Sequence, residues 1–186
     1  RVEEVFEKRS PKNPAVISKT DGIVTEIKEE GREKVLVVAP MAGQGKKDGS
    51  AYEYLAPYPR VPLVKEGDTV VKGQILTDGS ADLDDLFEYA GRAAVQEYII
   101  TEASKIYELQ GAPVSRKHLE VVVKQMFSRV KITDAGDTDY SVGDVVEDWE
   151  IVKSVKEMKD AGKIEPKSRE IVLGIKESAL SRRSFL

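Results

Sequence analysis

Residues 61–76 read VPLVKEGDTVVKGQIL, and this stretch decides the fold of the first half of the chain. Gly67 and Gly73 each stand in a short polar turn, with β-branched and apolar pairs between and after the turns. Glycine turns so close together predict short strands folded into a tight, curved β-unit. A shorter copy of the pattern, VGDVV, occupies residues 142–146. Such units are typical of small barrels and sandwich hybrids.

Further β-signals precede this stretch. Residues 23–27 alternate between apolar and polar side chains, and residues 35–38 form a continuous apolar run that suits a buried strand. A helical pattern over residues 1–9 ends before Pro11. The glycine- and lysine-rich residues 40–50 do not match a phosphate-binding loop, because no Gly-Lys-Ser/Thr ending opens a helix there. We expect a solvated hairpin tip instead.

From residue 80 onward the apolar spacing becomes helical. We expect helices at residues 81–88, at 92–109, from Ser115 through the apolar positions that end at Val130, and at 148–160, followed by an extended segment at 170–175. Ser80 and Ser115 stand where helix caps are expected. The prediction is an α+β fold, a β-rich barrel- or sandwich-hybrid-like N-terminal half followed by a helical half, divided into residues 1–79 and 80–186.

The composition excludes several classes of site. The 186 residues contain no cysteine, so disulfides and thiolate zinc sites are absent. His118 is the one histidine, which rules out a histidine metal cluster, and we expect a structural or surface role for it. The formal charge of −4 argues against a free-standing nucleic-acid binder, which usually carries a basic footprint. Any DNA contact should therefore be local.

Targeting signals are also missing from the sequence. No apolar run has the length of a membrane span, and the N-terminus has no signal-peptide pattern, so we expect a cytoplasmic protein without membrane contact. The chain opens at Arg1 without a methionine and closes on the apolar pair Phe185-Leu186. We expect it to be a fragment of a longer protein.

Two other features favour structural interpretations. Asp82, Asp84 and Asp85 stand at a helix start, where the helix dipole alone stabilises carboxylates, so we do not expect a magnesium site there. Trp149 falls at helical spacing with Val152 and is expected in the core, although an exposed tryptophan could stack on bases.

Several longer words resemble the β′ subunit family of bacterial RNA polymerase, downstream of its trigger loop. These words are RVEEVFE (1–7), AVI (15–17), DGIV (21–24), YIITE (98–102), YELQG (107–111), HLEVVVKQM (118–126), LGI (173–175) and SFL (184–186). The first resembles the segment after the trigger helices, the next two resemble the jaw, and the last two are similar to the start of switch 1. The resemblance covers essentially the whole chain, in the family's order.

The resemblance implies a function. It implies a non-catalytic part of a DNA-directed RNA polymerase, a nucleotidyltransferase, that helps to enclose downstream duplex DNA during transcription. The partners would be the other polymerase subunits (β, α, ω and, in the holoenzyme, sigma). The parent enzyme would hold magnesium and zinc elsewhere, so no catalytic or metal-binding residue and no cofactor is expected here, and whether the chain alone counts as an enzyme stays open.

The switch-like end supplies the candidate DNA contacts, Lys176, Arg182 and Arg183. The family usually has a basic residue two places after its Gly-Ile pair, whereas Glu177 takes that place here. This departure weakens the case for template contact at Glu177.

Two alternatives compete with this interpretation. A lipoyl or biotinyl carrier is suggested by the word KEGDTVVKG at residues 65–73. Carriers present the modified lysine on a hairpin tip, yet the only similar word, EMKD at 157–160, falls in an expected helix. An independent enzyme lacks support, because the sequence offers no set of nucleophile, base and orienting group.

Overall fold

The computed structural model describes residues 2–41 and 50–180, and the chain divides into two compact units. One unit is Ser10–Val95, and the other combines Arg1–Arg9 with Gln96–Leu186. The β-rich unit is therefore an insertion within the helical unit. This division differs from the one expected at residue 79, because the leading helix joins the helical unit and residues 80–95 join the β-rich unit.

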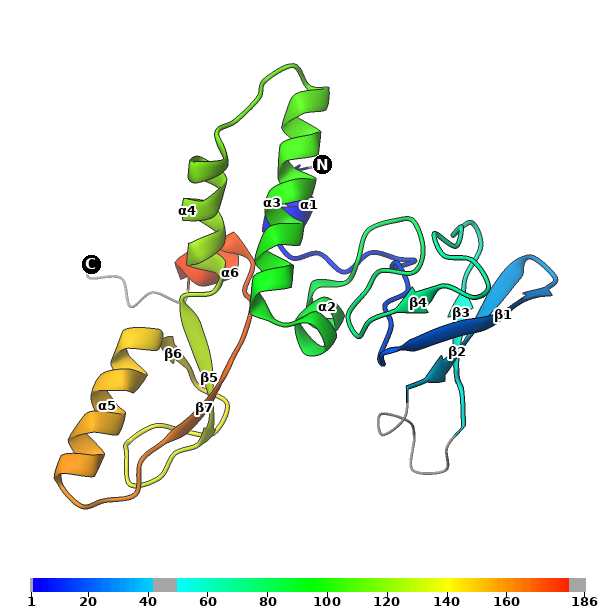
Figure 1. Ribbon diagram of the computed structural model, residues 1–186. Coiled ribbons are helices and arrows are strands. Elements are labelled where there is room, and N and C mark those ends of the chain that lie inside the picture. Colours follow the sequence, from blue (N-terminus) through cyan, green and yellow to red (C-terminus); the bar gives the residue numbers. More distant parts are fainter. Residues whose placement is uncertain (1, 42–49, 181–186) are drawn as a thin grey trace. The chain divides into compact units, whose positions relative to one another are not determined.

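The β-rich unit is built on a curled antiparallel sheet with the strand order β3-β2-β1-β4 (Figure 1). Its strands are β1 (Gly22–Glu30), β2 (Glu33–Pro40), β3 (Tyr52–Ala56) and β4 (Thr69–Val70). A shift in register between Val24 and Glu26 marks a bulge in β1, and bulges bend and twist a strand. The strands expected at residues 23–27 and 35–38 are confirmed.

Residues 61–76 pack against this sheet, and Val64, Val70 and Leu76 belong to its core. Isolated bridges pair Ile17 with Ile75 and Pro62 with Thr77. Gly73 has a φ of +84°, and a Cβ there would lie 2.5 Å from the Cα of Ala90 in helix α2 (Leu83–Ala90). Only glycine fits this close approach. The core beneath consists of Val24, Leu36, Val38, Tyr54, Ala56, Val64, Val70 and Leu76.

Helix α2 begins at a cap that differs from the expected one. The carboxylate of Asp82 accepts hydrogen bonds from the backbone N–H groups of Asp84 and Asp85, at 3.0 and 3.2 Å. The prediction of Ser80 as the cap was wrong by two residues. The expectation that the acidic cluster serves the helix start agrees with this geometry.

The helical unit contains a helical hairpin and a small sheet (Figure 1). Its elements are α1 (Val2–Phe6), α3 (Arg92–Leu109, which begins in the last residues of the β-rich unit), α4 (Arg116–Met126), β5 (Arg129–Asp134), β6 (Val145–Glu147), α5 (Asp148–Asp160), β7 (Lys167–Glu170) and α6 (Ile175–Leu180). The sheet has the order β6-β5-β7, and Ile151 of α5 is buried against Val130 and Ile132 of β5. The α+β class is confirmed.

Two boundaries in this unit differ from the prediction. Val130 was assigned to the helical stripe of α4, but α4 ends at Met126 and Val130 is a buried residue of β5. The extended segment expected at residues 170–175 overlaps β7 only at Glu170. Periodicity misled the assignment of Val130, because short apolar runs fit a strand and a helix equally well. The strand β7 carries only exposed residues, so the apolar residues 171–173 did not mark its position.

Candidate functional site

Of the predicted DNA contacts, Lys176 falls within the described residues. Lys176 lies in α6, and its side chain is 75% exposed. Its ammonium lies 2.5 Å from a carboxylate oxygen of Glu7, which follows α1. Arg182 and Arg183 lie outside the described residues. Lys176 is therefore accessible but already paired with a carboxylate.

Glu177 has a structural position in α6. Its carboxylate accepts a hydrogen bond from the backbone N–H of Gly174, at 3.3 Å. Gly174 directly precedes the helix, so Glu177 caps the helix start as the acidic member of a capping box does. The acidic residue that departs from the family pattern thus satisfies a backbone group that the helix leaves free.

Hydrogen bonds tie the other side of α6 to α4 and β5. The hydroxyl of Ser178, which is fully buried, donates to the carbonyl of Gln125 at 3.1 Å. The buried guanidinium of Arg129 donates to the carbonyl of Ser178 and to the carboxylate of Glu147, both at 3.3 Å. Sequence reasoning missed Arg129, because a basic residue between Ser128 and Val130 carries no local signal of burial.

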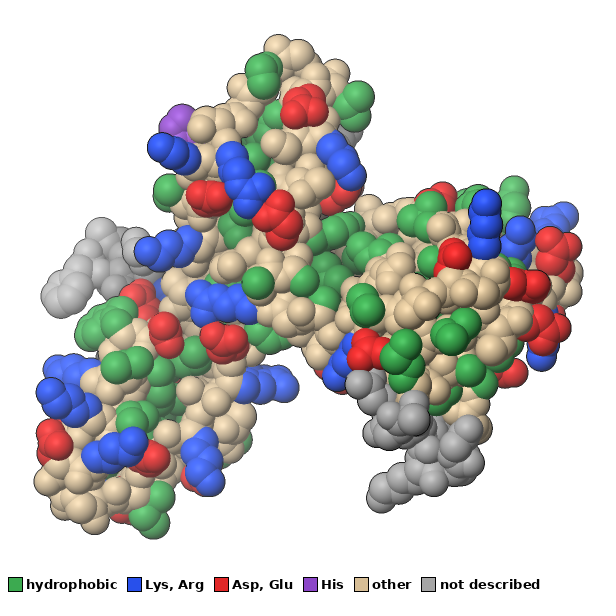
Figure 2. Space-filling view, viewed as in Figure 1, with side chains coloured by type: hydrophobic (Ala, Val, Ile, Leu, Met, Phe, Trp, Pro, Cys, Tyr) green, Lys and Arg blue, Asp and Glu red, His purple; other side chains and the backbone are tan. Residues whose placement is uncertain are grey.

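The exposed side of α4 carries a basic face that sequence reasoning also missed. We define this α4 face by Lys117, His118, Val121 and Lys124, all exposed. Lys and Arg side chains gather along this arm of the molecule beside the histidine (Figure 2). Their spacing of three, four and seven residues could have revealed the face, since such positions share one side of a helix. Among the described residues, no ion pair involves Lys117 or Lys124.

Arg116 lies next to this face but is neutralised. Its guanidinium donates two hydrogen bonds to Glu97, at 3.0 and 2.6 Å, and one to Glu120, at 2.8 Å. These carboxylates raise the pKa of Arg116, and the hydrogen bonds from Arg116 lower the pKa of Glu97. Arg116 therefore joins α3 to α4 and leaves the two lysines as the open positive charges of the face.

Trp149 lies on the surface, so the prediction that it belongs to the core was wrong. Its side chain is 61% exposed, and its indole N–H donates to the carboxylate of Glu147 at 2.6 Å. The neighbouring Ile151 and the half-buried Val155 pack on the sheet instead. Helical spacing identified an apolar stripe on α5, but the buried side of the helix carries Ile151 and not Trp149.

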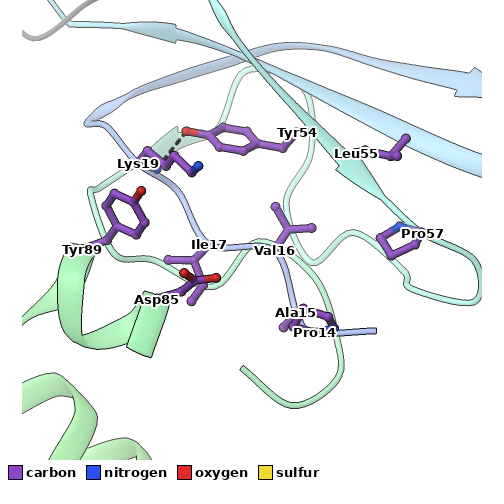
Figure 3. Close-up of a pocket in the computed structure, with 10 residues that line it drawn as sticks. All are labelled: Pro14, Ala15, Val16, Ile17, Lys19, Tyr54, Leu55, Pro57, Asp85 and Tyr89. Atoms are coloured by element: carbon purple, nitrogen blue, oxygen red, sulfur yellow. Dashed lines mark hydrogen bonds between the residues drawn. The ribbon is translucent and has the colours of Figure 1, made fainter. Parts of the chain in front are cut away.

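A hollow in the β-rich unit is bordered by β3, α2 and residues 14–19 (Figure 3). Its volume is about 250 Å³, below the range of about 300–1,000 Å³ usual for small-molecule sites. The hydroxyl of Tyr54 accepts a hydrogen bond from the backbone N–H of Lys19 at 2.8 Å, and burial raises the pKa of Tyr54. Desolvation, followed by the charge of Asp82, raises the pKa of Asp85. No catalytic set converges there among the lining residues.

The described residues carry neither a metal-ligating cluster nor a membrane-spanning helix. They contain no group of three or more histidine, cysteine or acidic side chains placed to hold a metal ion. No helix among residues 2–41 and 50–180 has the length and apolar character needed to cross a membrane.

The carrier alternative gains no support. Lys159 lies in helix α5, not on a hairpin tip, and its ammonium lies 3.1 Å from the carboxylate of Glu165. The paired lysine in a helix is unlike the exposed lysine of a carrier hairpin.

Comparison with known proteins agrees with the resemblance in the sequence. The family model described as RNA polymerase Rpb1, domain 5, matches residues 7–183. The whole chain is 39% identical to the DNA-directed RNA polymerase subunit β′ of Bacillus pumilus, 39% identical to that of Polynucleobacter asymbioticus and 36% identical to that of Bacillus subtilis. It spans 15%, 13% and 15% of these proteins, respectively. The chain therefore belongs to the RNA polymerase Rpb1 domain 5 family and matches a region of bacterial β′ subunits.

Proposed function

We propose that this chain is a non-catalytic region of a polymerase β′ subunit that helps to enclose downstream duplex DNA during transcription. The observation that carries the proposal is the similarity to β′ subunits along the entire chain. The parent assembly would be a DNA-directed RNA polymerase with β, α, ω and sigma subunits as partners. Magnesium and zinc would be bound elsewhere in that assembly.

The α4 face is the surface of the described chain best suited to contact DNA. Among the described residues, Lys117 and Lys124 of helix α4 form no ion pair, whereas the chain as a whole has a formal charge of −4. Lys117 and Lys124 lie about 10 Å apart along the helix axis, from seven steps of about 1.5 Å. Two open ammonium groups at this spacing can contact separate phosphates of one DNA strand, whose charges repeat every ~3.4 Å along the axis.

Phosphate contacts of this kind give affinity without reading sequence. Lysine neutralises phosphates as a point charge, and base edges are read by other contacts. The small number of unpaired cations therefore predicts a weak, salt-sensitive affinity for DNA. This affinity would contribute within the assembly and would be low for the isolated chain. A DNA-enclosing surface must let the duplex slide, and a sequence-independent contact permits this.

Site-specific photocrosslinking tests the proposal in the assembled polymerase. A photoreactive amino acid replaces Val121, the exposed apolar residue of the α4 face, in the full-length β′ subunit. We expect crosslinks to the duplex downstream of the active centre. The matched position is Val152 on α5, exposed to a similar degree but outside the face. Crosslinks only to protein at position 121, with none to DNA from either position, would contradict the proposal.

A further inference from the structure

Two segments from opposite ends of the described chain meet in the helical unit. The carboxylate of Glu7 lies 2.5 Å from the ammonium of Lys176, and the ammonium of Lys8 donates to the carbonyl oxygen of Val172 at 3.1 Å. Glu7 and Lys8, adjacent in the chain, thus bind residues 172 and 176 of one segment. A dipeptide that bonds the other segment in two places fixes its direction as well as its distance.

The backbones of the two segments also touch. A Cβ on Gly174 would lie 2.5 Å from the carbonyl oxygen of Glu7, so this position has no space for any other residue. Lys8 has a φ of +54°, a left-handed conformation that lysine rarely adopts. Strained backbone persists only where the surroundings hold it in place. Its presence at the contact indicates that the geometry is tightly determined.

The far side of the same segment is anchored independently. The N–H of Leu173 donates to the carbonyl of Met126 at 2.9 Å, at the end of α4. Ser178 and Arg129 add the buried hydrogen bonds described above. Residues 172–178 are therefore held between residues 7–8 on one side and the α4–β5 connection on the other.

We propose that Glu7 is a positioning residue that, with Lys8, fixes the path of residues 172–176 and joins the two ends of this region into one junction. The β′ subunits to which this chain is similar extend well beyond the matched region, since the chain spans only 13–15% of their length. In a full-length subunit the junction would connect the chain before α1 to the chain after α6. A displacement of either connection would reach the other through these contacts. The inference stands on family membership and does not depend on DNA contact.

The simplest competing interpretation is an ordinary surface ion pair of little consequence, because Lys176 is largely exposed. The side chain of Glu7, however, is only 15% exposed, and its second oxygen accepts a hydrogen bond from Arg9 at 2.9 Å. The carboxylate of Glu7 therefore has less freedom than the acid of an ordinary surface ion pair. Charge reversal is therefore the sharpest perturbation.

Hydrogen–deuterium exchange on the assembled polymerase tests the junction. The full-length β′ subunit carries Glu7→Lys, Lys176→Glu or both changes. Glu3→Lys is the matched control, because Glu3 is an exposed acid in α1, the helix that directly precedes Glu7. We expect each single reversal to speed exchange of the amides at residues 173–178 by about tenfold, as opening of that segment becomes easier. Lys176→Glu should also speed exchange at residues 2–8, although the substitution is remote in sequence.

The double reversal decides between positioning and loose surface pairing. In the double variant the positive and negative charges exchange places, so the attraction between positions 7 and 176 returns. Exchange should then fall back to within about twofold of the wild type. Lys176→Glu changes an exposed side chain and should assemble even if Glu7→Lys does not. Unchanged exchange at residues 173–178 in Lys176→Glu, an unrescued double variant, or an equal effect of Glu3→Lys would each overturn the proposal.

Discussion

At the scale of single residues, the C-terminal part of the helical unit depends on a close backbone contact and on a helix cap. Gly174 lies against the carbonyl oxygen of Glu7, and Glu177 caps the helix that follows. These two residues place α6 relative to the start of the chain before any larger packing is considered. Their roles explain why a glycine and an acid stand there.

Gly174→Ala should destabilise the chain. The added methyl group would lie within 2.5 Å of a backbone oxygen that cannot rotate away, and forced overpacking costs about 1–3 kcal/mol. Urea unfolding measures the loss. Ala179→Ser, an exposed change in helix α6, should stay within about 0.5 kcal/mol of the wild type. Equal stability of Gly174→Ala and the wild type would show that the backbones are not in contact.

The pair of Glu7 and Lys176 should impose a pH dependence on stability. Hydrogen bonds from Lys176 and then Arg9 lower the pKa of Glu7 below its ordinary value of 4.5. A lowered pKa in the folded state means that the contribution is complete above 4.5 and is lost as pH falls through the folded-state value. The stability difference between wild type and Glu7→Gln should therefore shrink in acid. A difference that stays constant from pH 6 to pH 3 would contradict the pairing.

At the scale of elements, helix α2 offers a test between two caps. Asp82 accepts two backbone hydrogen bonds at the helix start, while Ser80 was the cap expected from the sequence. Asp82→Ala should cost about 0.5–2 kcal/mol of stability, and Ser80→Ala should cost much less. Urea unfolding of both variants compares them directly. A larger loss from Ser80→Ala would restore the cap expected from the sequence.

The elements show which signals in the sequence suffice to predict structure. Strands β1 and β2 and helix α3 follow from alternation, apolar runs and helical periodicity, which are local properties of the chain. Val130 was assigned to a helix although it lies in β5, and Trp149 was assigned to the core although it is exposed. Val130 is covered within the β5 sheet, whereas the side of α5 that carries Trp149 faces away from it. Periodicity alone cannot supply that information.

The candidate site divides in the same way. Lys176 was identified from its place in a family-like word, and its pairing with Glu7 could not be foreseen, because the two residues are far apart in the sequence. Arg129 is buried with partners from α6 and β6, so its role also depends on tertiary structure. Only the spacing of Lys117, Val121 and Lys124 was present in the sequence as a readable signal.

At the scale of the whole molecule, an acidic chain whose described residues include the basic α4 face suits the proposed DNA contact within an assembly. The formal charge of −4 opposes DNA binding in general, whereas the α4 face favours it locally. The proposed contribution of this region is therefore a small number of phosphate contacts. Each such contact adds a fixed amount to the salt dependence of binding.

The most direct measurement is the salt dependence of DNA affinity, by fluorescence anisotropy of a labelled duplex with the assembled polymerase. Wild type is compared with Lys117→Glu/Lys124→Glu and with the control Lys153→Glu/Lys156→Glu, which reverses two exposed lysines on α5. Loss of two phosphate contacts should reduce the slope of log affinity against log salt by about 2 for the α4 variant and leave the control slope unchanged. Three equal slopes, or an equal reduction in both variants, would contradict the account.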